Sequence, residues 1–175
     1  MKNQLKILIT GAGGPAVSFM IKQLRSYRDC YIIAIDMNKN SSGFFLADKS
    51  YVVPPGNSNK FECKLRDIIT KNSINVVISV VDEELEVISK LSKELNYFCI
   101  QPKLSFIKNC LDKYKFSKLL NKLNLEDLNT HTLSSFIKKK LINKNNFPII
   151  LKPRFGRGSR GVKIINSIKE FNHKV

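Results

Sequence analysis

The first part of the chain alternates between short apolar runs and segments whose apolar side chains recur at helical spacing. Residues 5–10 form an apolar run with β-branched side chains, closed by the glycine-rich turn 11–14. Residues 17–24 carry apolar side chains three or four positions apart, which predicts a helix with one buried face. A second apolar run, 31–35, ends at Asp36. This order predicts the opening βαβ unit of a doubly wound sheet.

The same alternation continues as far as residue 103. Further strands are expected over 48–53, 76–81 and 97–100, and further helices over 61–69 and 85–95. The run 76–81 is almost wholly β-branched, as in a strand buried on both faces. Asp82 is expected to cap the helix that follows it. We therefore predict an α/β domain with a mostly parallel sheet over residues 1–103.

A different pattern follows Pro102 and predicts a second, α+β domain over residues 104–175. Its expected elements are helices over 104–111, 113–123 and 133–142, strands over 149–152 and 162–165, and a final helix. Asp112 is the expected N-cap of the second of these helices, and Ser167 that of the last. The two strands enclose a glycine-rich loop, so we expect a hairpin.

The charge is uneven along the 175 residues, which hold 30 Lys and Arg against 14 Asp and Glu, a net charge of +16. The first 103 residues have 14 basic and 10 acidic side chains, and the last 72 have 16 and 4. A basic chain suggests a polyanionic partner such as nucleic acid. A general compositional bias explains the charge equally well, because 24 of the 30 basic residues are lysines.

The four cysteines and two histidines exclude the common structural zinc motifs, because no C-x-x-C pair is present. The chain contains no apolar run near the roughly 20 residues that a membrane-spanning helix needs. No signal of a secretory leader opens it. We expect a cytoplasmic protein with reduced thiols and no membrane partner.

The first glycine cluster, 10–16, lies where a dinucleotide-binding fold would hold a pyrophosphate, and Asp36 lies where a ribose-binding acid would be. An NAD(P)-dependent oxidoreductase is therefore one alternative, and Tyr114 and Lys118 have the spacing of a short-chain dehydrogenase pair. Pro15 argues against it, because proline removes one amide donor from the turn. A purely structural sharp turn is the other interpretation.

The second cluster, 152–161, is more informative. Arg154, Arg157 and Arg160 are three of only six arginines in a chain whose other basic residues are mostly lysines. This use of arginine indicates that the planar guanidinium group has a role in the segment. The segment is no Walker loop, because it lacks Gly-Lys-[Ser/Thr] and precedes a strand. We interpret it as a flexible hairpin flap over a triphosphate. The alternatives are an exposed hairpin tip and an Arg-Gly RNA-binding segment, although such tracts are normally disordered.

With these motifs, the whole chain resembles the N-terminal part of ATP-grasp enzymes, especially the group like the large subunit of carbamoyl phosphate synthase. The segments that carry the resemblance are 9–14, 43–49, 82–85, Asp112-Lys113 with Phe116 and Leu120, and 148–162. The last of these is the most specific. The resemblance implies a Rossmann-like pre-ATP-grasp domain with a mostly parallel sheet, followed by a partial ATP-grasp α+β lobe.

The resemblance also implies a reaction: carboxylate activation by ATP and Mg²⁺ through an acyl phosphate, followed by carbon–nitrogen bond formation. Lys113 and Lys152 would contact ATP phosphates, and the loop would cover the triphosphate. The implied nucleotide-binding residues are Lys113, Lys152, Arg154, Gly156, Arg157, Gly158, Ser159, Arg160 and Gly161. No residue is assigned a catalytic role, and the carboxylate substrate is open.

The family's magnesium ligands would follow the phosphate loop. In this sequence, Glu170 is the only acidic residue after Gly161. One carboxylate does not make a magnesium site, so its ligands are expected outside these residues. We therefore expect the chain to act as part of a longer ligase and to be inactive alone. Its expected partners are ATP, a small carboxylate, the remainder of the ATP-grasp domain and, through an open sheet edge, a second copy.

Overall fold

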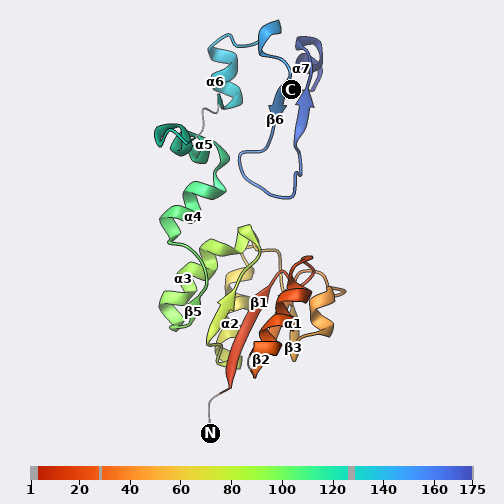
Figure 1. The fold of residues 1–175 in the computed structure, drawn as a ribbon, viewed down its shortest axis with the longest axis vertical. Helices are drawn as coiled ribbons and strands as arrows, with labels where there is room; N and C mark the ends of the chain where they lie inside the picture. The colour runs from red at the N-terminus through yellow and green to blue at the C-terminus, as the bar shows by residue number, and fades with distance from the viewer. Residues whose placement is uncertain (1–3, 28, 126–128, 175) are drawn as a thin grey trace. The chain divides into compact units, whose positions relative to one another are not determined.

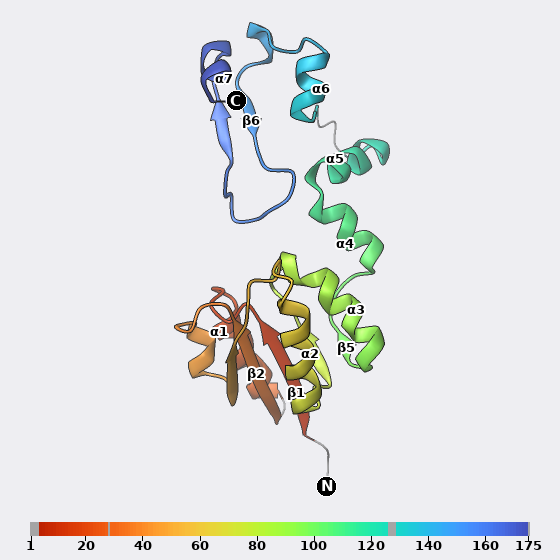
Figure 2. The same cartoon turned by 180° about the vertical axis from the view of Figure 1, so that it is seen from behind.

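A computed structural model describes residues 4–27, 29–125 and 129–174. The chain forms two compact units, residues 1–104 and 105–175, and each is described by itself. Figures 1 and 2 show the elements of both units from opposite sides.

The first unit is an α/β layered structure built on a five-stranded sheet (Figure 1). Its elements are β1 (Leu5–Thr10), α1 (Val17–Tyr27), β2 (Cys30–Asp36), η1 (Ser42–Phe45), β3 (Lys49–Val52), α2 (Phe61–Asn72), β4 (Val76–Ile78), η2 (Asp82–Glu84), α3 (Leu85–Leu95) and β5 (Phe98–Cys99). The strand order is β3-β2-β1-β4-β5, and every neighbouring pair is parallel. The predicted fold class is confirmed.

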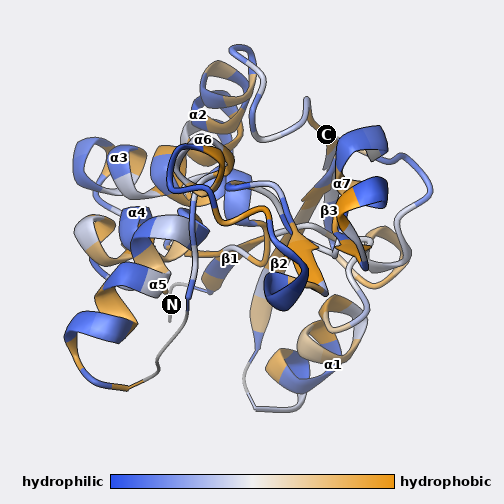
Figure 3. Cartoon of the chain, turned by 90° about the horizontal axis from the view of Figure 1, so that it is seen from above, coloured by the Kyte–Doolittle hydropathy of each residue, from blue (hydrophilic) through white to orange (hydrophobic). Residues whose placement is uncertain are grey.

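The two faces of this sheet bury different helices, because successive side chains of a strand point to opposite sides. Ile7 and Ile9 of β1 pack with Val17 and Ile21 of α1 in one cluster. Leu8, between them in sequence, packs with α2 and α3 in the other cluster. The helices accordingly show apolar and polar segments side by side in the hydropathy view (Figure 3).

The end of β4 differs from the prediction. The strand ends at Ile78 rather than at residue 81, because the Ser79 hydroxyl contacts Thr10 Oγ1 at 3.0 Å and accepts from the Val81 amide at 3.3 Å. The predicted capping role of Asp82 is wrong. Asp82 is the first residue of the 3-10 turn η2, and α3 begins after Glu84.

The second unit contains short helices and one hairpin. Its elements are α4 (Leu104–Leu111), α5 (Lys113–Lys122), α6 (Leu133–Lys138), η3 (Lys144–Asn146), β6 (Ile149–Leu151), β7 (Lys163–Ile165) and α7 (Ile168–Lys174). Strands β6 and β7 are antiparallel, as predicted, and loop 152–162 joins them. The third helix is shorter than expected: it ends at Lys138 rather than at residue 142. Phe171 packs against Phe136 and Phe147, with ring centroids 6.0 and 6.3 Å apart.

Candidate functional site

Asp112 is the N-cap residue of helix α5 and the first residue of the candidate site. It has extended backbone geometry, and its Oδ1 accepts hydrogen bonds from the amides of Tyr114 at 3.2 Å and Lys115 at 3.1 Å. A carboxylate at this position satisfies amides that have no partner within the helix. The predicted N-cap is confirmed. The side chain is buried, with 3% of its surface exposed.

The same carboxylate binds Arg154, which follows β6. Arg154 Nε donates to Asp112 Oδ1 at 2.8 Å, and Nη2 donates to Oδ2 at 2.7 Å. This two-pronged geometry matches the planar guanidinium fork to both carboxylate oxygens. The guanidinium also lies 5.6 Å from the ring centre of Tyr114 and 5.7 Å from that of Phe155. Asp112 therefore joins the start of α5 to the loop after β6.

The hydrogen bonds from Arg154 lower the pKa of Asp112 from 3.8 to about 2. Amides of Lys115 and Tyr114 act in the same direction, and desolvation opposes them. Conversely, the hydrogen bonds to Asp112 raise the pKa of Arg154. The pair is therefore fully ionised at neutral pH.

Because of this ion pair, we expect part of the free energy of unfolding to depend on pH in the acidic range. Because the folded carboxyl has the lower pKa, its contribution is complete above the unfolded value of 3.8 and is lost as the pH falls through about 2. Replacing Asp112 with Asn should therefore reduce the free energy of unfolding at pH 6 and have a smaller effect at pH 2.5. Urea denaturation at both pH values measures this difference. An equal effect of the substitution at both pH values would contradict it.

Lys113, the first residue of α5, makes two further bonds to the loop. Its backbone amide donates to the Arg154 carbonyl oxygen at 3.1 Å. Its Nζ donates to the Gly156 carbonyl oxygen. The structure thus brings together Lys113, Arg154 and Gly156, three of the residues singled out in the sequence.

The glycine-rich loop, residues 156–161, is exposed along its whole length. Its backbone has positive φ at Gly156, Gly158, Ser159 and Gly161. A side-chain atom added at Gly156 or Gly158 would meet nothing within 4 Å, whereas one at Gly161 would lie 2.9 Å from the Pro153 ring. The tip of the loop is therefore open to a ligand, and its end is packed.

The other predicted residues lie on or beside this loop. Lys152 is exposed and directly follows β6, and Arg157, Ser159 and Arg160 are exposed within the loop. Sequence reasoning missed the pairing of Asp112 with Arg154, because it assigned one to a helix cap and the other to phosphate. The available signal was the choice of arginine at position 154 in a chain whose basic residues are mostly lysines.

The backbone of the first glycine turn is bonded to neighbouring groups of the protein. The Gly13 amide donates to Asp36 Oδ2 at 2.8 Å, so the two groups that would hold a dinucleotide bind each other. The Ala12 carbonyl oxygen accepts from the Gly43 amide at 3.0 Å. A side-chain carbon at Gly43 would lie 2.7 Å from that oxygen, so segment 42–45 packs closely on the turn. These contacts favour the structural interpretation over an oxidoreductase.

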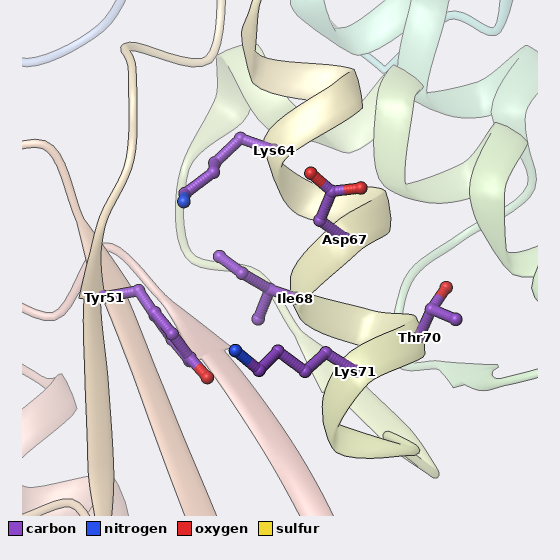
Figure 4. Close-up of a pocket in the computed structure, with 6 residues that line it drawn as sticks. All are labelled: Tyr51, Lys64, Asp67, Ile68, Thr70 and Lys71. Atoms are coloured by element: carbon purple, nitrogen blue, oxygen red, sulfur yellow. The ribbon is translucent and has the colours of Figure 1, made fainter.

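A shallow pocket of about 490 Å³ lies elsewhere on the first unit, between β3 and α2 (Figure 4). It is lined by Tyr51, Lys64, Asp67, Ile68, Thr70 and Lys71. The Tyr51 hydroxyl donates to Asn72 Oδ1 at 3.1 Å, which holds the ring at the pocket wall. None of the residues singled out in the sequence lines this pocket.

Within the described part of the chain, no three His, Cys, Asp or Glu side chains gather as metal ligands would. The residues that the structure describes therefore do not fit a magnesium site. Among the same residues, none of the helices has both the length and the apolar character needed to cross a membrane.

The comparisons with known proteins concern both units. The family model described as PylC-like, N-terminal domain, matches residues 7–102. The solved N5-carboxyaminoimidazole synthetase of Staphylococcus aureus, in complex with ADP, is similar with a TM-score of 0.76 and 18% identity, over 99% of this chain and 44% of that one. An L-amino acid ligase from Bacillus licheniformis is similar with a TM-score of 0.68 and 17% identity, over 100% and 42%.

A third similar structure is the N5-carboxyaminoimidazole ribonucleotide synthetase of Thermotoga maritima, with a TM-score of 0.68 and 21% identity, over 98% of this chain and 44% of that one. No curated protein sequence matches the chain. The chain spans less than half the length of these three structures. At such identities the likeness establishes the fold, which this chain shares with part of each of these synthetases and of the ligase.

Proposed function

The chain belongs to the family of PylC-like N-terminal domains, and on this basis we propose that it forms the phosphate-binding first part of an ATP-grasp ligase. In such a ligase, ATP phosphorylates a carboxylate and leaves as ADP, and an amine or ammonia attacks the acyl phosphate, forming a carbon–nitrogen bond and releasing inorganic phosphate. The synthetases and ligase of similar fold support this class.

One observation carries the proposal: the start of α5 is bonded to the base of the glycine-rich loop. Lys113 reaches Gly156, and Arg154 reaches Asp112, although about 40 residues separate the partners in sequence. A lysine, an exposed loop with positive φ and further cations therefore gather at one place. This donor set suits phosphate oxygens, which prefer ammonium, guanidinium and backbone amide donors.

The chemistry assigns a role to each group. A transferred phosphoryl group needs positioning and neutralisation of its oxygens more than covalent help. Lys113 and Lys152 would provide point charges, while Arg157, Ser159, Arg160 and the loop amides would cover the phosphates. The described residues supply no magnesium site, so we assign no metal ligand to this chain and derive no step through the metal.

The hairpin supports a larger assembly around this site. Ile150 and Ile164 are register partners on β6 and β7, and they are 66% and 60% exposed. Such a pair of exposed isoleucines is typical of a sheet that another layer covers. We propose that the rest of the ATP-grasp domain covers it and supplies the remaining substrate contacts.

Isothermal titration calorimetry with ATP in magnesium chloride tests the function. Lys152→Ala and Lys113→Ala should each weaken ATP binding about 10- to 100-fold, because each removes a charged hydrogen bond worth about 1.5–3 kcal/mol. Lys139→Ala, which removes an exposed lysine from the end of α6, is the control and should leave the affinity unchanged.

Two outcomes would overturn the proposal. One is binding of ATP that neither lysine variant weakens. The other is tight binding of NAD⁺ or NADP⁺ that ATP does not displace and that Gly13→Val abolishes, which would restore the oxidoreductase.

A further inference from the structure

We infer that Asp112 and Arg154 are positioning residues, whose ion pair holds Lys113 and the base of the glycine-rich loop in the arrangement that binds phosphate; this inference rests on the proposed function. The sequence pattern places Arg154 among the groups that touch phosphate. In the structure its guanidinium binds the Asp112 carboxylate.

Arg154 directs its fork toward a protein carboxylate. Nε and Nη2 both donate to Asp112, and the guanidinium plane lies near the rings of Tyr114 and Phe155. To bind a phosphate through the same edge, Arg154 would have to leave a buried carboxylate without its cation. The Arg154 side chain is 46% exposed, but Asp112 is buried, and a buried carboxylate left without its cation is unfavourable. Arg154 is therefore held in place as part of the scaffold.

Asp112 is a suitable anchor, because its own orientation is fixed. Two amides of α5 bind Oδ1, and the carboxylate is almost completely buried. The guanidinium thus docks on a group that cannot rotate freely. The backbone bond from the Lys113 amide to the Arg154 carbonyl oxygen runs beside the ion pair. The N-cap residue and the first residue of α5 therefore hold both the side chain and the backbone of Arg154.

This anchoring explains how an exposed loop can keep a binding geometry. A loop with three glycines within six residues has many accessible conformations, and ordering them on ligand binding costs affinity. Fixing the loop at its base lowers that cost. The same bonds place Lys113 Nζ at the Gly156 carbonyl oxygen, at the start of the loop. Arginine, unlike lysine, can donate two parallel hydrogen bonds to one carboxylate. This explains why a chain with 24 lysines among its 30 basic residues has arginine at position 154.

Asp112→Asn separates a positioning role from direct contact. This variant keeps an oxygen that can cap α5 but weakens the hold on Arg154, which remains present and charged. If Arg154 touched phosphate directly, its release would leave ATP binding unchanged or tighten it. If the pair positions the loop, ATP binding measured by titration calorimetry should weaken about tenfold.

The companion variants are Arg154→Lys, Arg154→Gln and the double variant Asp112→Asn with Arg154→Gln. We expect each single variant to weaken ATP binding about tenfold and the double variant to add little, because both changes break one unit. Lys122→Gln is the charge control, since it removes one exposed cation from the far end of α5. Amide NMR signals of Gly156, Gly158 and Gly161, recorded without nucleotide, should shift in the Arg154 variants and stay in place in the control.

The outcomes are distinguishable. Absence of ATP binding by the unchanged chain overturns the proposed function and this inference with it. If the unchanged chain binds ATP and Lys152→Ala weakens that binding, then unchanged or tighter binding by Asp112→Asn overturns the inference alone. Rescue by Arg154→Lys also overturns it, because a point charge would then suffice. Unfolding free energies of the variants at neutral pH show whether any loss of binding reflects unfolding.

Discussion

Phe61→Ala should lower the free energy of unfolding of the first unit by about 3–5 kcal/mol. Phe61 is the first residue of α2, is fully buried and packs into the cluster beneath the sheet. Alanine would remove most of a ring from a core that cannot close over the space. Urea denaturation followed by circular dichroism measures the change.

The matched control for this substitution is Phe19→Ala in α1. Phe19 is 67% exposed, so its truncation should change the free energy of unfolding by no more than about 0.5 kcal/mol. Similar losses for the two phenylalanines would mean that α2 does not pack as described.

Gly11→Ala is expected to have the second-largest effect, a loss of about 2–4 kcal/mol. Gly11 has φ of +64°, and a side-chain carbon there would lie 2.6 Å from Val81 Cγ2 and 2.9 Å from Val80 Cγ2. Alanine therefore brings both a left-handed backbone penalty and a steric clash. Thermal and urea unfolding of the variant measure the loss.

Gly158→Ala separates these two costs. Gly158 has nearly the same φ, +62°, but nothing lies within 4 Å of an added carbon. It should therefore cost only the backbone penalty, about 1 kcal/mol, in the unfolding of its own unit. An effect of Gly11→Ala no larger than this would rule out the packing contribution at the first glycine turn.

The fold of the first unit was predictable because its central strands are short and rich in apolar side chains. The run 5–10 fixes β1, and its alternation decides which side chains face α1. The shortening of β4 was not visible, because one of the two contacts of the Ser79 hydroxyl is with Thr10, 69 residues away. Pattern reasoning works with local spacing, and this contact is not local.

The candidate site shows the same division. Asp112 was identifiable as a cap, since capping involves residues two and three positions ahead. Its second partner, Arg154, could be placed only by the fold. The roles of Lys152, Arg157, Ser159 and Arg160 remain predictions that the titration experiments test.

Asp112 binds both the amides of α5 and the guanidinium of Arg154, and these two sets of bonds can form at different times during folding. Its bonds to the α5 amides join neighbours and can form as soon as that helix does, within about a microsecond. Its bond to Arg154 closes a segment of 42 residues, so it must wait until the hairpin arrives. During synthesis, Asp112 and the amides that it caps leave the ribosome before Arg154, which lies 42 residues further along the chain. The side chain that caps α5 is thus also the one that waits for Arg154, so a local bond and a long-range bond form on the same carboxylate at different times.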